Sequence, residues 1–235
     1  MKKKNLAITL IIGMVTVLIA GVVYIKVSNP KFEDLDPSWG MGTKVTEAVS
    51  NDRDYYWYVD QYSTGKFGYI NCGPTSIEMV AKWNNKDSNI KAEALRDKYA
   101  PKGLGIHPYE LYNWATDYDI KVRWLNDINQ ELLKDEINKG NIVIVGLYLG
   151  DITYNPNKQE RVGKYFDVDY GHYVIVKGYK VVDEKLYFET YDSYSGEQRY
   201  NDSEFVGMNR YYLGEEFIKS ANSYWSEGLV VENLN

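Results

Sequence analysis

The chain has one cysteine and two histidines among its 235 residues, which restricts the nucleophilic chemistry open to it. Cys72 stands in the sequence Asn-Cys-Gly-Pro-Thr-Ser at 71–76, just before a segment of helical periodicity that Pro74 can begin. Unpaired N–H groups and the positive dipole end of such a helix stabilise a thiolate, the nucleophilic form of cysteine. We therefore predict that Cys72 is a nucleophile rather than a buried structural cysteine.

Two histidines are available as the base that a thiol nucleophile needs, and their contexts differ. His172 precedes the apolar run 173–176, so we expect it at the start of a strand, where a side chain is held rigidly. His107 stands directly before Pro108 at the start of a predicted helix, which is typical of a capping or surface residue. The sequence therefore favours His172 as the general base.

Asp192 ends the next predicted strand and could orient the imidazole. If 172–179 and 185–191 form an antiparallel hairpin, a turn centred at 182 places Asp192 opposite His172. A turn centred on 183 and 184 places position 195 there instead and leaves Asp192 displaced. Both registers stay open, and Asp192 lies near His172 in each.

An oxyanion formed during acyl transfer needs hydrogen-bond donors. The amide of Cys72 is one candidate donor. Gln61, at the end of the aromatic and strand-like segment 54–61, is a plausible side-chain donor. Alone, a glutamine at a strand end would more often be solvated, so this prediction depends on the other residues.

The elements that must position these residues follow from periodicity and from Gly and Pro. Helices predominate in the first half of the chain and strands in the second, which indicates an α+β domain rather than an alternating parallel sheet. We expect helices over 74–84, 88–99, 108–118, 129–139 and about 215–221, strands over 54–61, 120–125, 141–149, 172–179 and 185–191, a further strand piece from 211, and a long loop over 151–170.

In the order Gln61, Cys72, His172 and Asp192, these residues resemble papain-like cysteine peptidases of the C39 type, and most closely the bacterial peptidase C39-like domain. The resemblance implies a papain-like α+β fold, with the cysteine on a helix and the histidine on an antiparallel sheet. It implies that Cys72 is the nucleophile, His172 the general base, Asp192 the orienting acid and Gln61 the oxyanion donor. It covers about 55–225 and is carried by the segments 58–61, 71–76, 171–179 and 192–194.

Residues 6–25 form an uncharged apolar segment, and 20 residues in a helix span roughly 30 Å, the thickness of a bilayer core. Lys2, Lys3 and Lys4 precede it, so the positive-inside rule keeps the amino terminus in the cytoplasm. We predict a signal anchor over 1–28, a linker over 29–52 and the peptidase-like domain over 53–235. A cleaved signal peptide is the alternative, and it would make the protein secreted. Both alternatives place the domain outside the cytoplasm.

Residues 31–235 contain 23 basic and 33 acidic residues, and this acidic balance argues against a nucleic-acid partner. One cysteine excludes an intramolecular disulfide and a multi-cysteine metal site. We predict no metal and no cofactor, and we expect a monomer that acts on a peptide or protein substrate. The predicted function is membrane-anchored extracytoplasmic cysteine hydrolysis of a peptide or amide bond. A thiol acyltransferase and a non-catalytic peptide-binding module on the same fold are the alternatives.

Overall fold

The computed structural model describes residues 32–234. The signal anchor predicted over 1–28 and the first residues of the predicted linker lie outside this part of the chain. Within it, no helix combines the length and the apolar character needed to cross a membrane.

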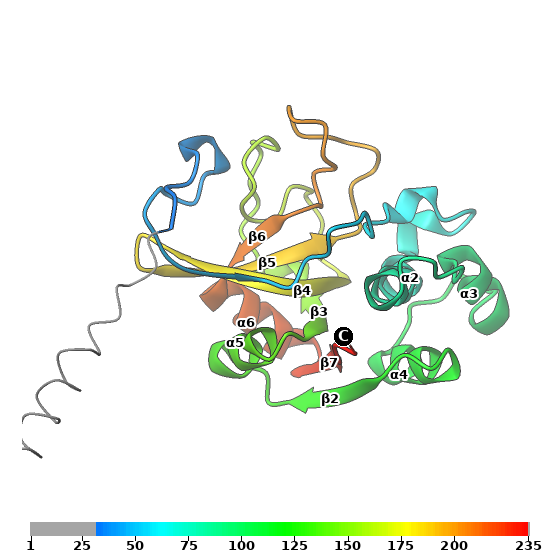
Figure 1. Ribbon diagram of the computed structural model, residues 1–235. Coiled ribbons are helices and arrows are strands. Elements are labelled where there is room, and N and C mark those ends of the chain that lie inside the picture. The colour runs from blue at the N-terminus through cyan, green and yellow to red at the C-terminus, as the bar shows by residue number, and fades with distance from the viewer. Residues whose placement is uncertain (1–31, 235) are drawn as a thin grey trace, which may run out of the picture. The chain divides into compact units, whose positions relative to one another are not determined.

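One antiparallel sheet forms the centre of the described domain, with strand order β2-β7-β3-β4-β5-β6 (Figure 1). The long strand β4 pairs with β3 along its first half and with β1 along its second half, and with β5 on its other edge. The strands are β1 (Val45–Ser50), β2 (Val122–Asn126), β3 (Ile142–Tyr148), β4 (Gly171–Val182), β5 (Lys185–Asp192), β6 (Arg210–Leu213) and β7 (Glu227–Val231).

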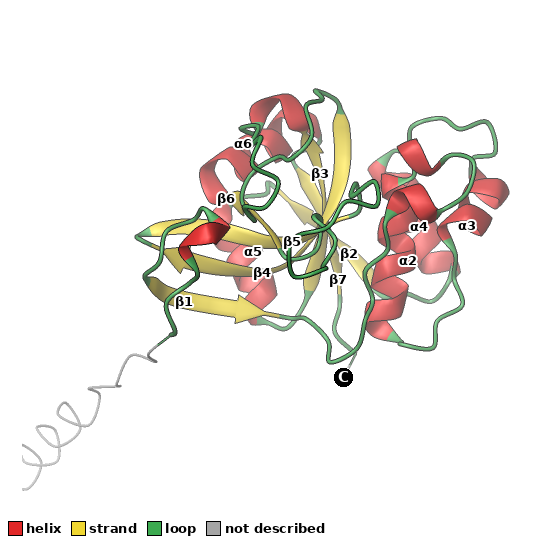
Figure 2. Ribbon diagram, turned by 90° about the horizontal axis from the view of Figure 1, so that it is seen from above, coloured by secondary structure: helices red, strands yellow, loops and turns green. Residues whose placement is uncertain are grey.

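Helices cover the sheet in two groups, which Figures 1 and 2 show on different sides of it. The first is α2 (Cys72–Asn84), α3 (Ala92–Tyr99) and α4 (Pro108–Asp117), and the second is α5 (Gln130–Asn138) and α6 (Gly214–Tyr224). Alternate residues of β4 face the two groups of helices, because successive side chains of a strand point to opposite faces of the sheet. Tyr173 and Ile175 join the core beneath α2 and α4, whereas Val174 and Val176 join the core beneath α5 and α6.

The predicted α+β class and the five predicted helices are confirmed, with ends that shift by up to four residues. The remaining helical turns are of the 3-10 type. They cover Pro37–Trp39, Gln61–Ser63, Gly68–Ile70 and Leu149–Asp151.

Two predictions about the strands and the linker were wrong, and one further strand was not predicted. The segment 54–61 forms no strand before the turn at Gln61, because its backbone pairs with no neighbouring strand, although Trp57 and Tyr58 are buried in the core. The predicted linker contains β1, whose β-branched residues pair with the half of β4 that β3 leaves free. The tail after α6 contains β7, which fills the place between β2 and β3.

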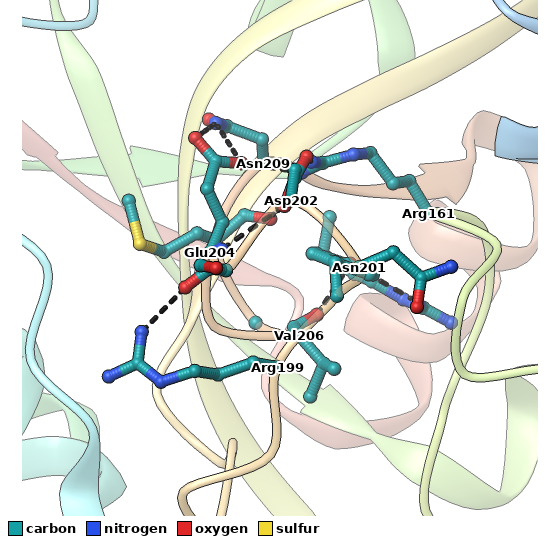
Figure 3. A network of polar contacts seen from close by, with 12 residues as sticks. Arg161, Arg199, Asn201, Asp202, Glu204, Val206 and Asn209 are labelled. Carbon is teal, nitrogen blue, oxygen red and sulfur yellow. Dashed lines mark hydrogen bonds and ion pairs between the residues drawn. The ribbon is translucent and has the colours of Figure 1, made fainter.

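The predicted loop over 151–170 is confirmed, apart from isolated bridges and the end of a 3-10 turn. Buried Arg161 attaches it to the loop that follows β5, where Asp202 and Glu204 accept hydrogen bonds from the guanidinium. Figure 3 shows this polar network, in which Asn209 also donates to Glu204. The network holds the loop that carries Phe166, whose ring packs edge-on against His172.

The β4–β5 hairpin turns at Asp183 and Glu184, both with positive φ, so its turn is the one centred on 183 and 184. That register alone would pair Asp192 with Ile175, on the face of β4 opposite to His172. Between Val176 and Gly178 the register shifts by one residue, which makes Lys177 the extra residue of a β-bulge. Asp192 therefore pairs with Val174, on the same face as His172.

Lys177 is fully buried in this bulge. Its ammonium lies 2.7 Å from Asp52 Oδ2 and 2.6 Å from Glu189 Oε1, and it lies over the ring of Tyr191. The bulge is thus held by two charge-assisted hydrogen bonds to carboxylates from separate segments.

Replacing Lys177 by Met should lower the free energy of unfolding by about 3–5 kcal/mol, because Glu189 would keep a buried charge without its cation. Urea denaturation followed by circular dichroism measures this. The control is Lys185→Met at the exposed start of β5, which should change stability by less than about 0.5 kcal/mol. Equal stabilities of the two variants would contradict this account of the bulge.

Candidate active site

Cys72 is the first residue of α2, two residues earlier than the sequence predicted. Asn71 occupies the N-cap position, and Ser76 Oγ donates back to the Cys72 carbonyl. Cys72 is half-buried as a residue: it packs against the core and also lines a cavity. Cys72 therefore lies at the helix start that the sequence predicted, where the Gly73 N–H acts on the thiol.

His172 is the second residue of β4 and is almost completely buried. Its Nε2 lies 2.8 Å from Asp192 Oδ1, and it lines the same cavity as Cys72. Because Asp192 takes Nε2, the other ring nitrogen, Nδ1, is left for the thiol. His172 is therefore joined to Asp192 by a hydrogen bond and lies at the same cavity as the Cys72 thiol.

Asp192 is fully buried and accepts three hydrogen bonds. Besides His172, Oδ1 accepts from the Tyr194 N–H at 2.9 Å, and Oδ2 accepts from the Tyr212 hydroxyl at 2.6 Å. Burial by itself raises the pKa of this carboxyl, but the charge of His172 and these donors outweigh it and hold the pKa below its ordinary value. Asp192 is therefore an ionised acceptor that fixes the imidazole.

The pKa values of Cys72 and His172 depend on the same balance of burial against neighbouring charges and hydrogen bonds. Burial by itself raises the pKa of the Cys72 thiol, but the hydrogen bond and charge of His172, with the N–H groups of Tyr173 and Gly73, bring it below its ordinary value. Burial alone would lower the pKa of His172, but Asp192 and the thiolate raise it to about 10. Both shifts favour the thiolate–imidazolium form of the pair over the neutral form.

Gln61 is buried and begins the 3-10 turn Gln61–Ser63. Its Oε1 accepts a hydrogen bond from the Ser193 hydroxyl, and its backbone N–H donates to the Ser193 carbonyl. With Oε1 held in this way, the amide nitrogen is the end left to donate. Gln61 lines the same cavity of about 410 Å³ as Cys72 and His172.

His107 is the exposed N-cap of α4, as predicted. Its backbone N–H donates to Glu110 Oε2 at 2.8 Å, and its ring packs edge-on against Trp225. It is not among the residues that line the cavity holding Cys72. The structure therefore brings Gln61, Cys72, His172 and Asp192 together and leaves His107 aside.

Arg96 was missed from the sequence. This buried residue of α3 donates to Asn71 Oδ1, to the Ile70 carbonyl and to the Leu104 carbonyl. No carboxylate lies within ion-pair distance of it in the described part of the chain. Arg96 thus ties the segment before Cys72 to the loop before α4. An arginine on a short polar helix gives no local signal of such a role.

The family profile of the peptidase C39-like family matches residues 54–216. That match spans more than half of the chain. The chain belongs to the peptidase C39-like family. Its fold is papain-like, and its family is one of cysteine peptidases.

One solved structure supports the fold at low sequence identity, and two others show weaker similarity. A C39-like peptidase from Bacillus anthracis superposes with a TM-score of 0.55 at 14% identity, over 80% of this chain and 98% of that one. The peptidase domain of Streptococcus ComA, a bi-functional ABC transporter of a quorum-sensing pathway, gives 0.44 at 14% identity, over 70% and 93%. Xylellain, a cysteine protease from Xylella fastidiosa, gives 0.42 at 13% identity, over 89% and 93%. No curated protein matches the chain.

Cys72 should react with iodoacetamide at pH values well below about 8.5, the pKa of an ordinary thiol. His172→Gln removes the cation that favours the thiolate, so the rate at pH 6 should fall by about tenfold or more, and the profile should move to higher pH. Rate–pH profiles by mass spectrometry measure both effects. His107→Ala is the matched control, with the expected profile of the wild type. An unchanged profile in His172→Gln would refute the pairing.

Proposed function

We propose that the protein is a membrane-anchored extracytoplasmic cysteine hydrolase that cleaves a peptide or amide bond. The observation that carries this proposal is the hydrogen bond between His172 and Asp192 at a cavity that Cys72 and His172 both line. Gln61 from a separate segment lines the same cavity. The peptide substrate follows from the family, whose members are peptidases.

In the acylation step, the Cys72 thiolate attacks the carbonyl carbon of the scissile bond and forms a C–S bond. The carbonyl oxygen gains negative charge, and the Cys72 N–H and the Gln61 amide nitrogen are the donors available to it. The His172 imidazolium gives its proton to the leaving nitrogen as the C–N bond breaks. The products are a thioester on Cys72 and a free amine.

In the deacylation step, neutral His172 takes a proton from a water molecule as that water attacks the thioester carbonyl. The C–S bond breaks, the carboxylic acid leaves, and the thiolate–imidazolium pair returns. Asp192 holds the ring throughout, because its Oδ1 fixes Nε2 and its other contacts fix the carboxylate. Its role is orientation and charge stabilisation rather than proton transfer.

The rate of hydrolysis should be abolished by loss of Cys72 and lowered by the loss of the Asp192 charge. Wild-type protein incubated with a mixed peptide library should generate new amino termini, Cys72→Ala should generate none, and Asp192→Asn should lose about 10²–10⁴ in kcat/KM. The activity should rise with pH through the lowered pKa of Cys72 and fall as His172 deprotonates near pH 10. Mass spectrometry of termini and initial rates measure these results.

The control for the hydrolysis experiment is Tyr109→Ala, an exposed position on α4 outside the cavity, which should keep wild-type rates. Cleavage that persists in Cys72→Ala would contradict the proposed nucleophile. Binding of peptides without any cleavage by the wild type would favour the binding-module alternative.

The extracytoplasmic location follows from the apolar segment 6–25 and the three lysines before it. A carboxyl-terminal epitope tag on the full chain should stay with membranes after alkaline carbonate extraction. External protease should remove the tag from intact cells. A variant with Lys2, Lys3 and Lys4 changed to Glu should lose this orientation in part. A tag that only lysis exposes to protease would contradict the proposed location.

A further inference from the structure

Asn71, the residue before Cys72, stands at the N-cap position of α2 but does not cap the helix. Asparagine is among the residues most favoured at this position, because its side-chain oxygen usually accepts from the N–H of the second or third helical residue. No such hydrogen bond forms here. The third helical residue is Pro74, which has no N–H. Gly73, the second, therefore carries the one N–H that a capping Asn71 would take.

Both ends of the Asn71 side chain are bound elsewhere. Its Oδ1 accepts from Arg96 Nε at 2.8 Å, and its Nδ2 donates to the carbonyl and the hydroxyl of Thr64 at 3.0 and 2.9 Å. Arg96 also donates to the Ile70 carbonyl at 3.0 Å, which fixes the peptide plane that leads into Asn71. The backbone of Asn71, with φ −88° and ψ 18°, lies outside the extended region that a capping residue adopts. Arg96 thus holds both the side chain and the backbone of Asn71 in a state that does not cap α2.

The Gly73 N–H is consequently left for the sulfur of Cys72. No carbonyl of the described chain accepts from this N–H, and the N–H acts on the thiol, where it lowers the pKa. A capping Asn71 oxygen would compete with the sulfur for the same donor. Since donors to the charged form favour that form, such competition would favour the neutral thiol over the thiolate.

The charge of Arg96 acts in the same direction as its hydrogen bonds. Arg96 is almost fully buried, and its three acceptors, on Asn71, Ile70 and Leu104, are all neutral. Burial lowers the pKa of Arg96, whereas a Cys72 thiolate raises it, so the two charged forms favour each other. The other ionisable groups that act on Arg96 are Glu110 and Tyr69, and those that act with Cys72 are His172, Tyr170 and Tyr173.

We propose that Arg96 is a positioning residue that holds Asn71 away from the first turn of α2 and thereby leaves the Gly73 N–H to the Cys72 sulfur. This inference rests on the proposed function of Cys72 as the nucleophile. Neither Arg96 nor Asn71 is among the residues that line the cavity at Cys72, so Arg96 acts through Asn71 rather than on the substrate.

The experiment compares rate–pH profiles of iodoacetamide labelling in the wild type, Arg96→Gln, Asn71→Ala and the double variant. Arg96→Gln releases Asn71 to cap Gly73, so the rate at pH 6 should fall by about fivefold or more, and the profile should move to higher pH. Asn71→Ala has no side chain that could cap and should keep the wild-type profile. Adding Asn71→Ala to Arg96→Gln should recover most of the lost rate, although the double variant has lost more contacts than the single one.

Arg53→Gln is the matched control, because Arg53 Nε donates to the Trp83 carbonyl near the other end of α2 at 3.0 Å. It should keep the wild-type profile, and the melting temperature of each variant reports whether it folds. Where Arg96→Gln does not fold, nuclear magnetic resonance of wild type with isotope-labelled glycine and arginine decides. The Gly73 amide resonance should move as Cys72 titrates, and the Arg96 Nε–H should exchange with solvent more slowly than in Asn71→Ala.

The outcomes separate this inference from the proposed function. A folded double variant that labels as slowly as Arg96→Gln would overturn the positioning role of Arg96 and leave the nucleophile standing, if the wild type labels rapidly. A Gly73 resonance that does not respond to the titration of Cys72, or equal exchange of the Arg96 Nε–H in both proteins, would overturn it as well. Slow labelling of the wild type at neutral pH would instead overturn the proposed function together with this inference.

Discussion

The single extra residue in β4 is the constraint on which the rest of the site depends. Side chains alternate along a strand, so a register that differs by one residue sends every following side chain to the other face. The bulge at Lys177 makes that change between the hairpin turn and the site, and it brings Asp192 to the face that carries His172. The extra residue, Lys177, is a buried cation that the carboxylates of Asp52 and Glu189 neutralise. These ion pairs therefore lie at the point where the register of the acid and the imidazole is set.

The site also depends on electrostatic interactions among Cys72, His172 and Asp192. Three ionisable groups in a row are partly or fully removed from water, and each would be neutral if it were alone. They can be charged because each stabilises the next: the thiolate and the carboxylate both favour the imidazolium, and Tyr212 and the Tyr194 N–H favour the carboxylate. Such a row is cooperative, so the state of any member is a property of the whole. This explains why Tyr212, which is remote from the thiol in sequence, belongs to the same polar system.

The sequence was most informative where the signal is local. A cysteine before Gly-Pro predicted a helix start, a histidine before an apolar run predicted a strand start, and the structure places both there. It could not choose the hairpin register, because a bulge depends on contacts from Asp52 and Glu189. The sequence predicted a strand over 54–61 and a linker over 45–50, whereas the structure has a strand only over 45–50. Aromatic and β-branched residues suit any half-buried extended chain, and backbone pairing decides which segment becomes a strand. Arg96 and Asn71 act through distant carbonyls and amides, which no spacing in the sequence reveals.

The tip of the β4–β5 hairpin is the place where residues 43–44 contact the sheet. The Asp183 carboxylate there accepts from the N–H groups of Thr43 and Lys44, so the described chain joins the sheet at that tip. His172 lies at the other end of the same strand, ten residues from Val182, or roughly 33 Å along an extended chain. The described chain therefore enters the sheet at the end of β4 that lies opposite to His172.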